Sequence, residues 1–171
     1  MSFDPPLYGP DVKRILSLGE NRNRLIPLQF APYAAAEVRD LMNTFEPDQL
    51  FPDLEEPEVP LAGLWLYFAC FEEAHRLAEK CETEEGDLWH APVHRNCAGT
   101  YPIFANIARA AVKITRKFPT AEFRTGRWDP FAFLGFCDRA RKQPGSLQRR
   151  VAMEIQRAEW QILFDYTARP Q

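Results

Sequence analysis

Residues 61–82, LAGLWLYFACFEEAHRLAEKCE, carry the strongest helical pattern in this chain of 171 residues. Apolar side chains return there at steps of one, three and four, which is the spacing of one face of a helix. The stripe consists of Leu61, Leu64, Trp65, Phe68, Phe71, His75 and Ala78. The pattern predicts a single helix over 61–82, ended by the residues from Thr83 to Gly86.

Residues that begin and end helices recur on both sides of this stretch, whereas strand alternation is hard to find. Further helices are expected over 10–19, 32–45, 88–97, 102–118, 130–142 and from 147 onward, with Asp129 and Ser146 as N-caps of the last two. In the last helix, the expected buried stripe is Leu147, Val151, Ile155, Ala158, Ile162 and Tyr166. The chain is therefore predicted to be an all-α, single-domain bundle of six or seven helices, with four long ones forming the core.

Two segments are expected to differ from the rest of this single domain. Residues 1–30 are expected to form an N-terminal arm that need not pack tightly. Residues 46–60, EPDQLFPDLEEPEVP, contain four prolines among many acids, and proline disfavours regular helix in its surroundings. We expect 46–60 to be an irregular acidic connector that exposes its carboxylates.

Charge is distributed unevenly along the chain, although the net charge is only -3. Residues 37–90 hold fifteen acidic and three basic residues, and residues 109–150 hold three acidic and eleven basic ones. The basic half carries no zinc-finger, helix-turn-helix or stacked-aromatic pattern, so nucleic acid is not an expected partner. We interpret the two halves as facing each other across one fold or across a dimer interface.

The sequence favours a cytoplasmic protein without a membrane span. No uncharged stretch exceeds the thirteen residues of 59–71, whereas about 20 are needed to cross a bilayer. The N-terminus has acids and prolines where a secretory signal would have basic and apolar residues. The four cysteines show no disulfide or C-x-x-C spacing and are expected to be reduced.

All three histidines lie between positions 75 and 94. On a helix, His90 and His94 would point the same way, because residues four apart share a face. Together with His75 from the neighbouring helix, they form a candidate site for one divalent metal, either Zn, Ni or Fe. Glu72 is the candidate catalytic residue: it could act as a general base toward metal-bound water, bind the metal as a carboxylate ligand, or accept a hydrogen bond that fixes the tautomer of an imidazole. Pro92 either lies in the first turn of this helix or kinks it between the two histidines.

These residues also have purely structural interpretations. His75 on an apolar stripe is typical of a hydrogen-bonded core histidine, and His90 suits a helix cap. Glu73 could pair with Arg76 or Lys80 on its own helix. The helix lacks the glutamate of H-E-x-x-H, which excludes a zincin, and whether the protein is an enzyme stays open.

Three runs resemble an uncharacterised bacterial all-helical family, a domain of unknown function with no established activity. They are Trp89-His90-Ala91-Pro92-Val93-His94-Arg95, Trp128-Asp129-Pro130-Phe131-Ala132-Phe133 and Gln156-Arg157-Ala158-Glu159-Trp160. The likeness covers roughly residues 65–165 and implies that His75, His90, His94 and Arg95 share a polar site. The chain has Asn96-Cys97 where the family pattern has Arg-Glu, which puts any acid-dependent activity in doubt.

Two functions follow as hypotheses. The first is a soluble helical protein with a polar or divalent-metal pocket formed by His75, His90 and His94, of hydrolytic type, in which Arg95 binds a small anionic ligand through its planar fork of donors. The second is a non-catalytic helical interaction module, or a homodimer, that contains no metal. Thirteen phenylalanines and four tryptophans are many for this length, and a surplus of aromatic side chains suits an interface.

Overall fold

The computed structural model of the chain describes residues 8–19, 24–28, 36–83, 85–86, 89, 111 and 129–169. These residues form helices and contain no strand, which confirms the all-α bundle. The helices are α1 (Pro10–Ser17), α2 (Ala36–Met42), α3 (Pro47–Leu50), α4 (Glu58–Tyr67), α5 (Phe71–Lys80), α8 (Pro130–Arg141) and α9 (Leu147–Thr167). Within this described part of the chain, no helix is both long enough and apolar enough to cross a bilayer.

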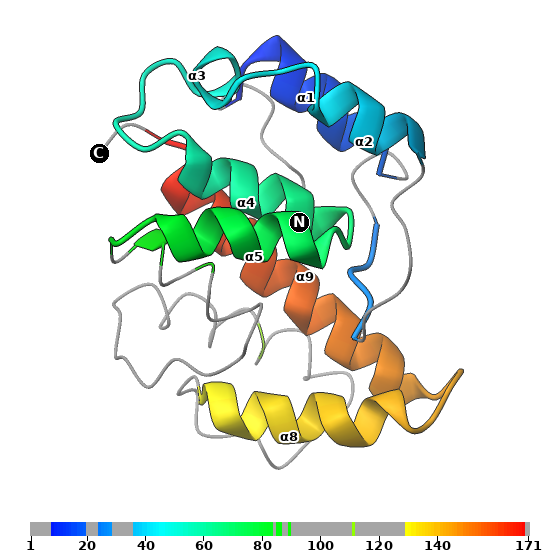
Figure 1. The fold of residues 1–171 in the computed structure, drawn as a ribbon. Helices are drawn as coiled ribbons and strands as arrows, with labels where there is room; N and C mark the ends of the chain where they lie inside the picture. The colour runs from blue at the N-terminus through cyan, green and yellow to red at the C-terminus, as the bar shows by residue number, and fades with distance from the viewer. Residues whose placement is uncertain are drawn as a thin grey trace.

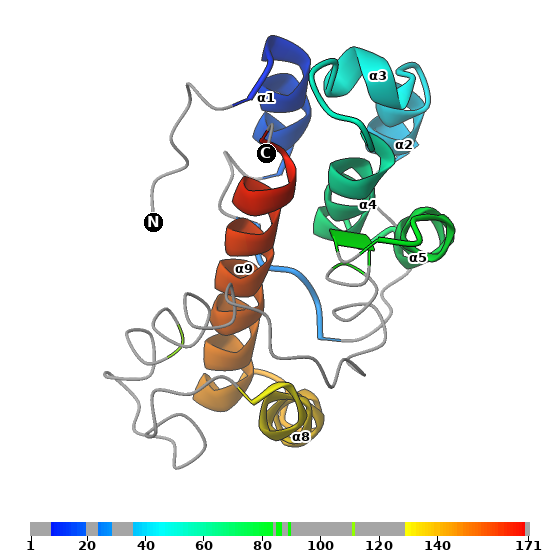
Figure 2. The same ribbon diagram turned by 90° about the vertical axis from the view of Figure 1, so that its left-hand side faces the viewer.

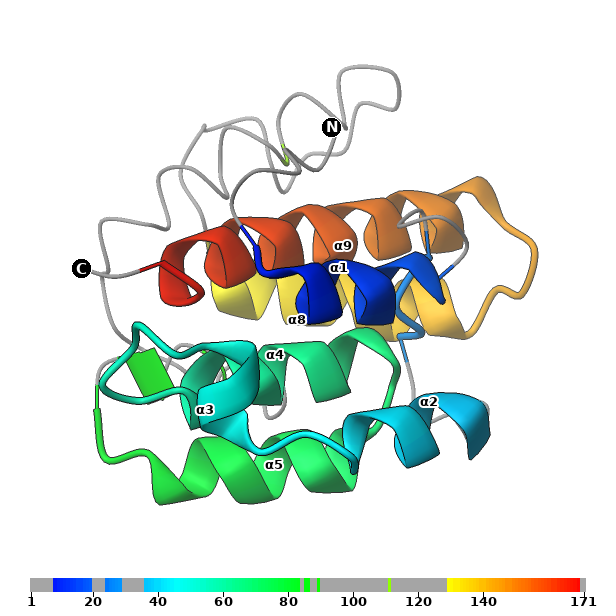
Figure 3. The ribbon, with the colours of Figure 1, turned by 90° about the horizontal axis from the view of Figure 1, so that it is seen from above.

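The longest of the described helices, α9, runs diagonally behind α4 toward the level of α8 (Figure 1). Helix α4 packs on α9, and α5 packs on the far side of α4. Figure 2 shows α8 crossing the N-terminal end of α9, whereas Figure 3 shows α1 lying along it. The four longest described helices therefore pack in the series α5, α4, α9 and α8.

Helix α4 is the centre of the core. Every residue from Val59 to Tyr67 is buried, which is expected for a helix that is apolar on all sides. On α9, the aromatic rings of Trp160 and Phe164 stack with centroids 4.9 Å apart, and Trp160 lies 4.5 Å from the ring of Tyr67 on α4. The expected stripe on α9 is wrong at its ends, since Leu147 and Tyr166 are exposed by 51% and 39%.

The predicted single helix over 61–82 is wrong, because the chain turns between α4 and α5. Ala69 has φ of 62°, and the Cys70 N–H donates to the Trp65 carbonyl oxygen at 2.9 Å. This left-handed residue ends α4, so α5 runs back antiparallel along it (Figure 3). The physical reason lies in the side chains: α4 is apolar all round, whereas α5 is amphipathic and buries only Ala74 and Ala78.

The described part of the N-terminal arm packs into the core. Helix α1 buries Val12, Ile15 and Leu16, each no more than 1% exposed. Tyr8 packs against Phe164 with ring centroids 5.1 Å apart and donates a hydrogen bond from its hydroxyl to Asp165. Apolar burial and a polar contact with α9 thus hold these described residues of the arm in place, whereas the rest of 1–30 lies outside the described residues.

The expected connector is partly helical. Residues 47–50 form α3, whose first turn is closed by reciprocal hydrogen bonds between Glu46 and Gln49, and α4 already begins at Glu58. Phe51 is buried against Phe164, with ring centroids 6.2 Å apart. The contact of Phe51 with Phe164 holds the segment between α3 and α4 against the end of α9. The acidic residues of this segment therefore lie at that end of α9.

Candidate functional site

The structure places two of the sequence-predicted site residues, His75 and Glu72, on α5. The His75 side chain is 31% exposed, and its Nδ1 lies 3.7 Å from Oε2 of Glu79, one turn further along the helix. His75 is therefore only partly buried, at the edge of the face that α5 packs against α4. Glu72 is exposed.

His90, His94 and Arg95 lie outside the described residues, so their relation to His75 stays a prediction. Among the residues that the structure does describe, no three His, Cys, Asp or Glu side chains gather closely enough to hold one metal ion. A metal site would therefore require His90 and His94, which follow Trp89 in the chain.

Trp89, the residue before His90, is firmly anchored. It is 1% exposed, and its Nε1 donates to Oγ1 of Thr167 on α9 at 3.1 Å. Its ring lies against Gly63 of α4, where a Cβ atom would meet ring atoms of Trp89. The Gly63 carbonyl oxygen accepts a hydrogen bond from Nε1 of Trp160 at 2.7 Å. Two indoles therefore meet at the one position of α4 that carries no side chain.

A cavity of about 420 Å³ opens at the end of the bundle where α4 begins and α9 ends. Its lining comes from the segment after α3, the first turn of α4, the segment after α5 and the end of α9. The lining residues are Asp53, Leu54, Glu55, Glu56, Val59, Thr83, Glu85, Thr167 and Arg169. We call this cavity the acidic end pocket.

Two threonines organise the wall of the acidic end pocket. The Thr83 hydroxyl donates to Oε2 of Glu56 at 2.8 Å and accepts from the N–H of Gly86 at 3.2 Å. Thr167 donates to the Leu163 carbonyl oxygen at 3.0 Å while it accepts from Trp89. These bonds tie three separate segments together, so the wall is built by tertiary contacts and not by one loop.

The acidic end pocket carries a negative field. Four carboxylates and one guanidinium line it, so their formal charges sum to -4 + 1 = -3. The pKa of the neighbouring Cys81 thiol is raised to about 11. Burial is the largest cause, and the negative charges of Glu56 and Glu58 add to it. A thiol with so high a pKa stays protonated at neutral pH, so Cys81 is a poor nucleophile.

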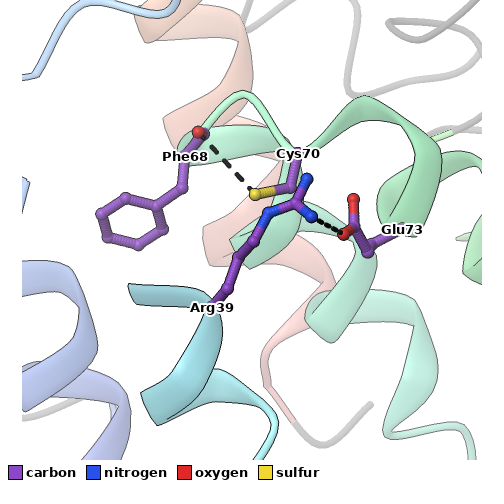
Figure 4. A network of polar contacts seen from close by, with 4 residues as sticks. All are labelled: Arg39, Phe68, Cys70 and Glu73. Carbon is purple, nitrogen blue, oxygen red and sulfur yellow. Dashed lines mark hydrogen bonds and ion pairs between the residues drawn. The ribbon is translucent and has the colours of Figure 1, made fainter. Parts of the chain in front are cut away.

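A second polar cluster joins α2 to the turn between α4 and α5 (Figure 4). Nη1 of Arg39 lies 3.1 Å from Oε1 of Glu73, and the Glu73 carboxylate raises the pKa of the Arg39 guanidinium. The buried Cys70 lies beside the guanidinium and donates from its thiol to the Phe68 carbonyl oxygen at 3.9 Å. Glu73 thus pairs with another helix, and not with Arg76 or Lys80. We interpret the cluster as a structural clamp.

Sequence reasoning missed most of the acidic end pocket as a site. Its only signal was the acidic composition of 46–60, which indicated exposed carboxylates without saying where they meet. No sequence pattern predicted that Thr83 and Thr167 lie close to that segment, because the three segments are far apart along the chain.

The motifs that carry the family resemblance have structural roles where they are described. Oδ1 of Asp129 accepts from the Ala132 N–H at 3.0 Å and caps α8, and Trp160 stands in the core. A scan against protein-family models finds no match to the chain, and comparisons with curated proteins and with solved structures find none either. The resemblance therefore stays a prediction.

Proposed function

We propose that the protein is a non-catalytic helical binding module whose acidic end pocket accepts a positively charged group. The observation that carries this proposal is that four carboxylates line one cavity of about 420 Å³. This volume falls within the range of small-molecule binding sites, about 300–1,000 Å³.

The chemistry of the wall suits an ammonium or guanidinium group on an aliphatic stem. The carboxylates of Asp53, Glu55 and Glu85 supply acceptors without donors, which pair with N–H groups. Leu54 and Val59 supply apolar surface against which methylene groups can pack. A lysine or arginine side chain combines both features.

Binding accounts for this arrangement better than catalysis does. Asp53, Glu55 and Glu56 are exposed to solvent, whereas catalytic carboxyl groups usually lie in sites from which water is partly excluded. Cys81 is held in its protonated form. We therefore propose no reaction for this pocket.

Titration with free arginine, followed by calorimetry or by NMR shifts, tests the proposal. Because exposed ion pairs contribute only about 0.2–1 kcal/mol each, we expect a dissociation constant near the millimolar range that weakens with salt. The double substitution Glu55→Gln/Glu56→Gln should weaken binding. The control, Glu37→Gln/Asp40→Asn, removes the same charge from exposed positions on α2 and should leave binding unchanged. Equal affinity in both double variants would refute the proposal.

The divalent-metal site at His75, His90 and His94 is the second candidate function. The spacing of His90 and His94 supports it, as does the carboxylate of Glu79 beside Nδ1 of His75. Metal-binding imidazoles are commonly oriented by a carboxylate in this way. The metal content of the purified protein tests it.

A further inference from the structure

The turn that joins α8 to α9 is strongly basic. Residues 139–150 contain five arginine or lysine residues and no acid: Arg139, Arg141, Lys142, Arg149 and Arg150. Positions 141–145 are exposed, and the turn projects beyond the ends of α8 and α9 (Figure 1). Leu147 follows directly, with 51% of its surface exposed. We call residues 139–150 the basic turn.

Helical partners neutralise only part of this charge. Arg141 pairs with Asp138 at 3.3 Å, and Arg150 pairs with Glu154 at 3.1 Å. Both pairs lie within one turn of their own helix and remain largely exposed. Lys142 adds a further positive charge on the exposed turn, and the partly buried Arg149 adds another in the first turn of α9.

The basic turn and the acidic end pocket lie at opposite ends of α9 (Figure 3). Helix α9 has 21 residues, which at 1.5 Å per residue is about 30 Å. That length exceeds the Debye length of about 8 Å at physiological salt several-fold. The two surfaces therefore cannot meet within one molecule, and each remains available to a second one.

We propose that the occupant of the acidic end pocket is the basic turn of a second copy of this chain, so that the protein associates head to tail. This inference rests on the proposed function, because it names the partner of the same pocket. Charge supports it, since a pocket with a formal charge of -3 faces a segment that bears five positive groups. Apolar surface supports it as well, because Leu147 is exposed on the turn while Leu54 and Val59 line the pocket.

The geometry also determines the kind of assembly. Because the two surfaces differ, a pair of bound copies still has one unoccupied acidic end pocket and one unoccupied basic turn. Such a heterologous contact either grows into chains or closes into a ring, unlike the two-fold contact of a common homodimer. Because the charges are exposed, the association is expected to be weak and to decline steeply with salt.

Analytical ultracentrifugation of the full chain tests this inference. In about 20 mM salt, where screening is weak, the average mass should rise continuously with protein concentration, and in about 300 mM salt the dissociation constant should increase at least about tenfold. Two neutralised variants, Lys142→Gln/Arg149→Gln and Glu55→Gln/Glu56→Gln, should each be monomeric alone. Mixed together, they retain one intact pocket and one intact turn, so they should form a heterodimer that grows no further.

Three results would overturn the inference: a wild type that stays monomeric in low salt, a closed dimer that neither variant disrupts, or a mixture that remains monomeric. Unfolding curves of both variants show whether each is folded. The outcomes also separate this inference from the proposed function. If arginine binding depends on Glu55 and Glu56 but the protein does not self-associate, only this inference is refuted. If the protein neither binds arginine nor self-associates, the proposed binding pocket is refuted as well.

Discussion

The contact between Gly63 and Trp89 allows two opposite expectations for the substitution Gly63→Ala. Replacement of glycine by alanine inside a helix normally stabilises a protein by about 0.5–1 kcal/mol. At Gly63, however, the new Cβ would lie 2.7 Å from Cη2 and 2.9 Å from Cε2 of Trp89, which is closer than carbon atoms approach each other. The indole or the helix would have to move.

The magnitude follows from what must be displaced. Overpacking of a well-packed core costs about 1–3 kcal/mol. A displaced indole also weakens the hydrogen bond from Trp89 Nε1 to Thr167, a bond of the kind that contributes about 0.5–1.5 kcal/mol. These costs outweigh the gain in helix propensity, so we expect Gly63→Ala to lower the free energy of unfolding by about 1–3 kcal/mol.

Urea denaturation followed by circular dichroism measures this change. The matched control is Gly135→Ala on α8, where the nearest atom to a new Cβ is Nη1 of Arg139 at 3.4 Å, at the flexible end of a side chain. We expect that control to be neutral or to stabilise by up to about 1 kcal/mol. In a Trp89→Leu background, Gly63→Ala should lose most of its cost, because the colliding ring is gone. If Gly63→Ala were as stabilising as Gly135→Ala, Trp89 could not lie against α4.

Three further predictions concern the turn, the thiol and the metal. Ala69→Gly should raise the free energy of unfolding by about 1 kcal/mol, because glycine adopts a φ of 62° without the strain that alanine bears; a loss of stability in urea denaturation would contradict the left-handed turn. The rate of Cys81 alkylation, followed by peptide mass spectrometry, should rise with pH until about pH 11, whereas a thiol with the ordinary pKa of 9 would level off near pH 9. Because the folded protein keeps the thiol proton to higher pH than the unfolded chain does, the free energy of unfolding should fall as the pH rises from 9 to 11. Glu56→Gln should lower the pH at which the alkylation rate is half its maximum. Protein purified without a histidine tag should contain close to one Zn, Ni or Fe per chain, lost in His90→Ala; a metal-free protein whose stability is unchanged by chelator would exclude the histidine site.

Local patterns identified the N-caps of α8 and α9 correctly, because each decisive contact there lies within a few residues. Asp129 accepts from the N–H of Ala132, and Ser146 accepts from that of Arg149 at 3.1 Å. Both are caps that span three residues, so the sequence alone contains the donor, the acceptor and the spacing. The all-α class and α1 were predictable for the same reason.

Tertiary structure decided what depends on distant segments. No glycine or proline marks the turn at Ala69; it forms because α4 is buried on all sides and α5 must cover it with one face. Arg39 meets Glu73 across 34 positions, and the acidic end pocket joins residues near 55, 83 and 167. The sequence contains the charges of the acidic end pocket and of the basic turn, whereas the path of α9 decided that these two surfaces lie at opposite ends, because one continuous helix holds its two termini apart.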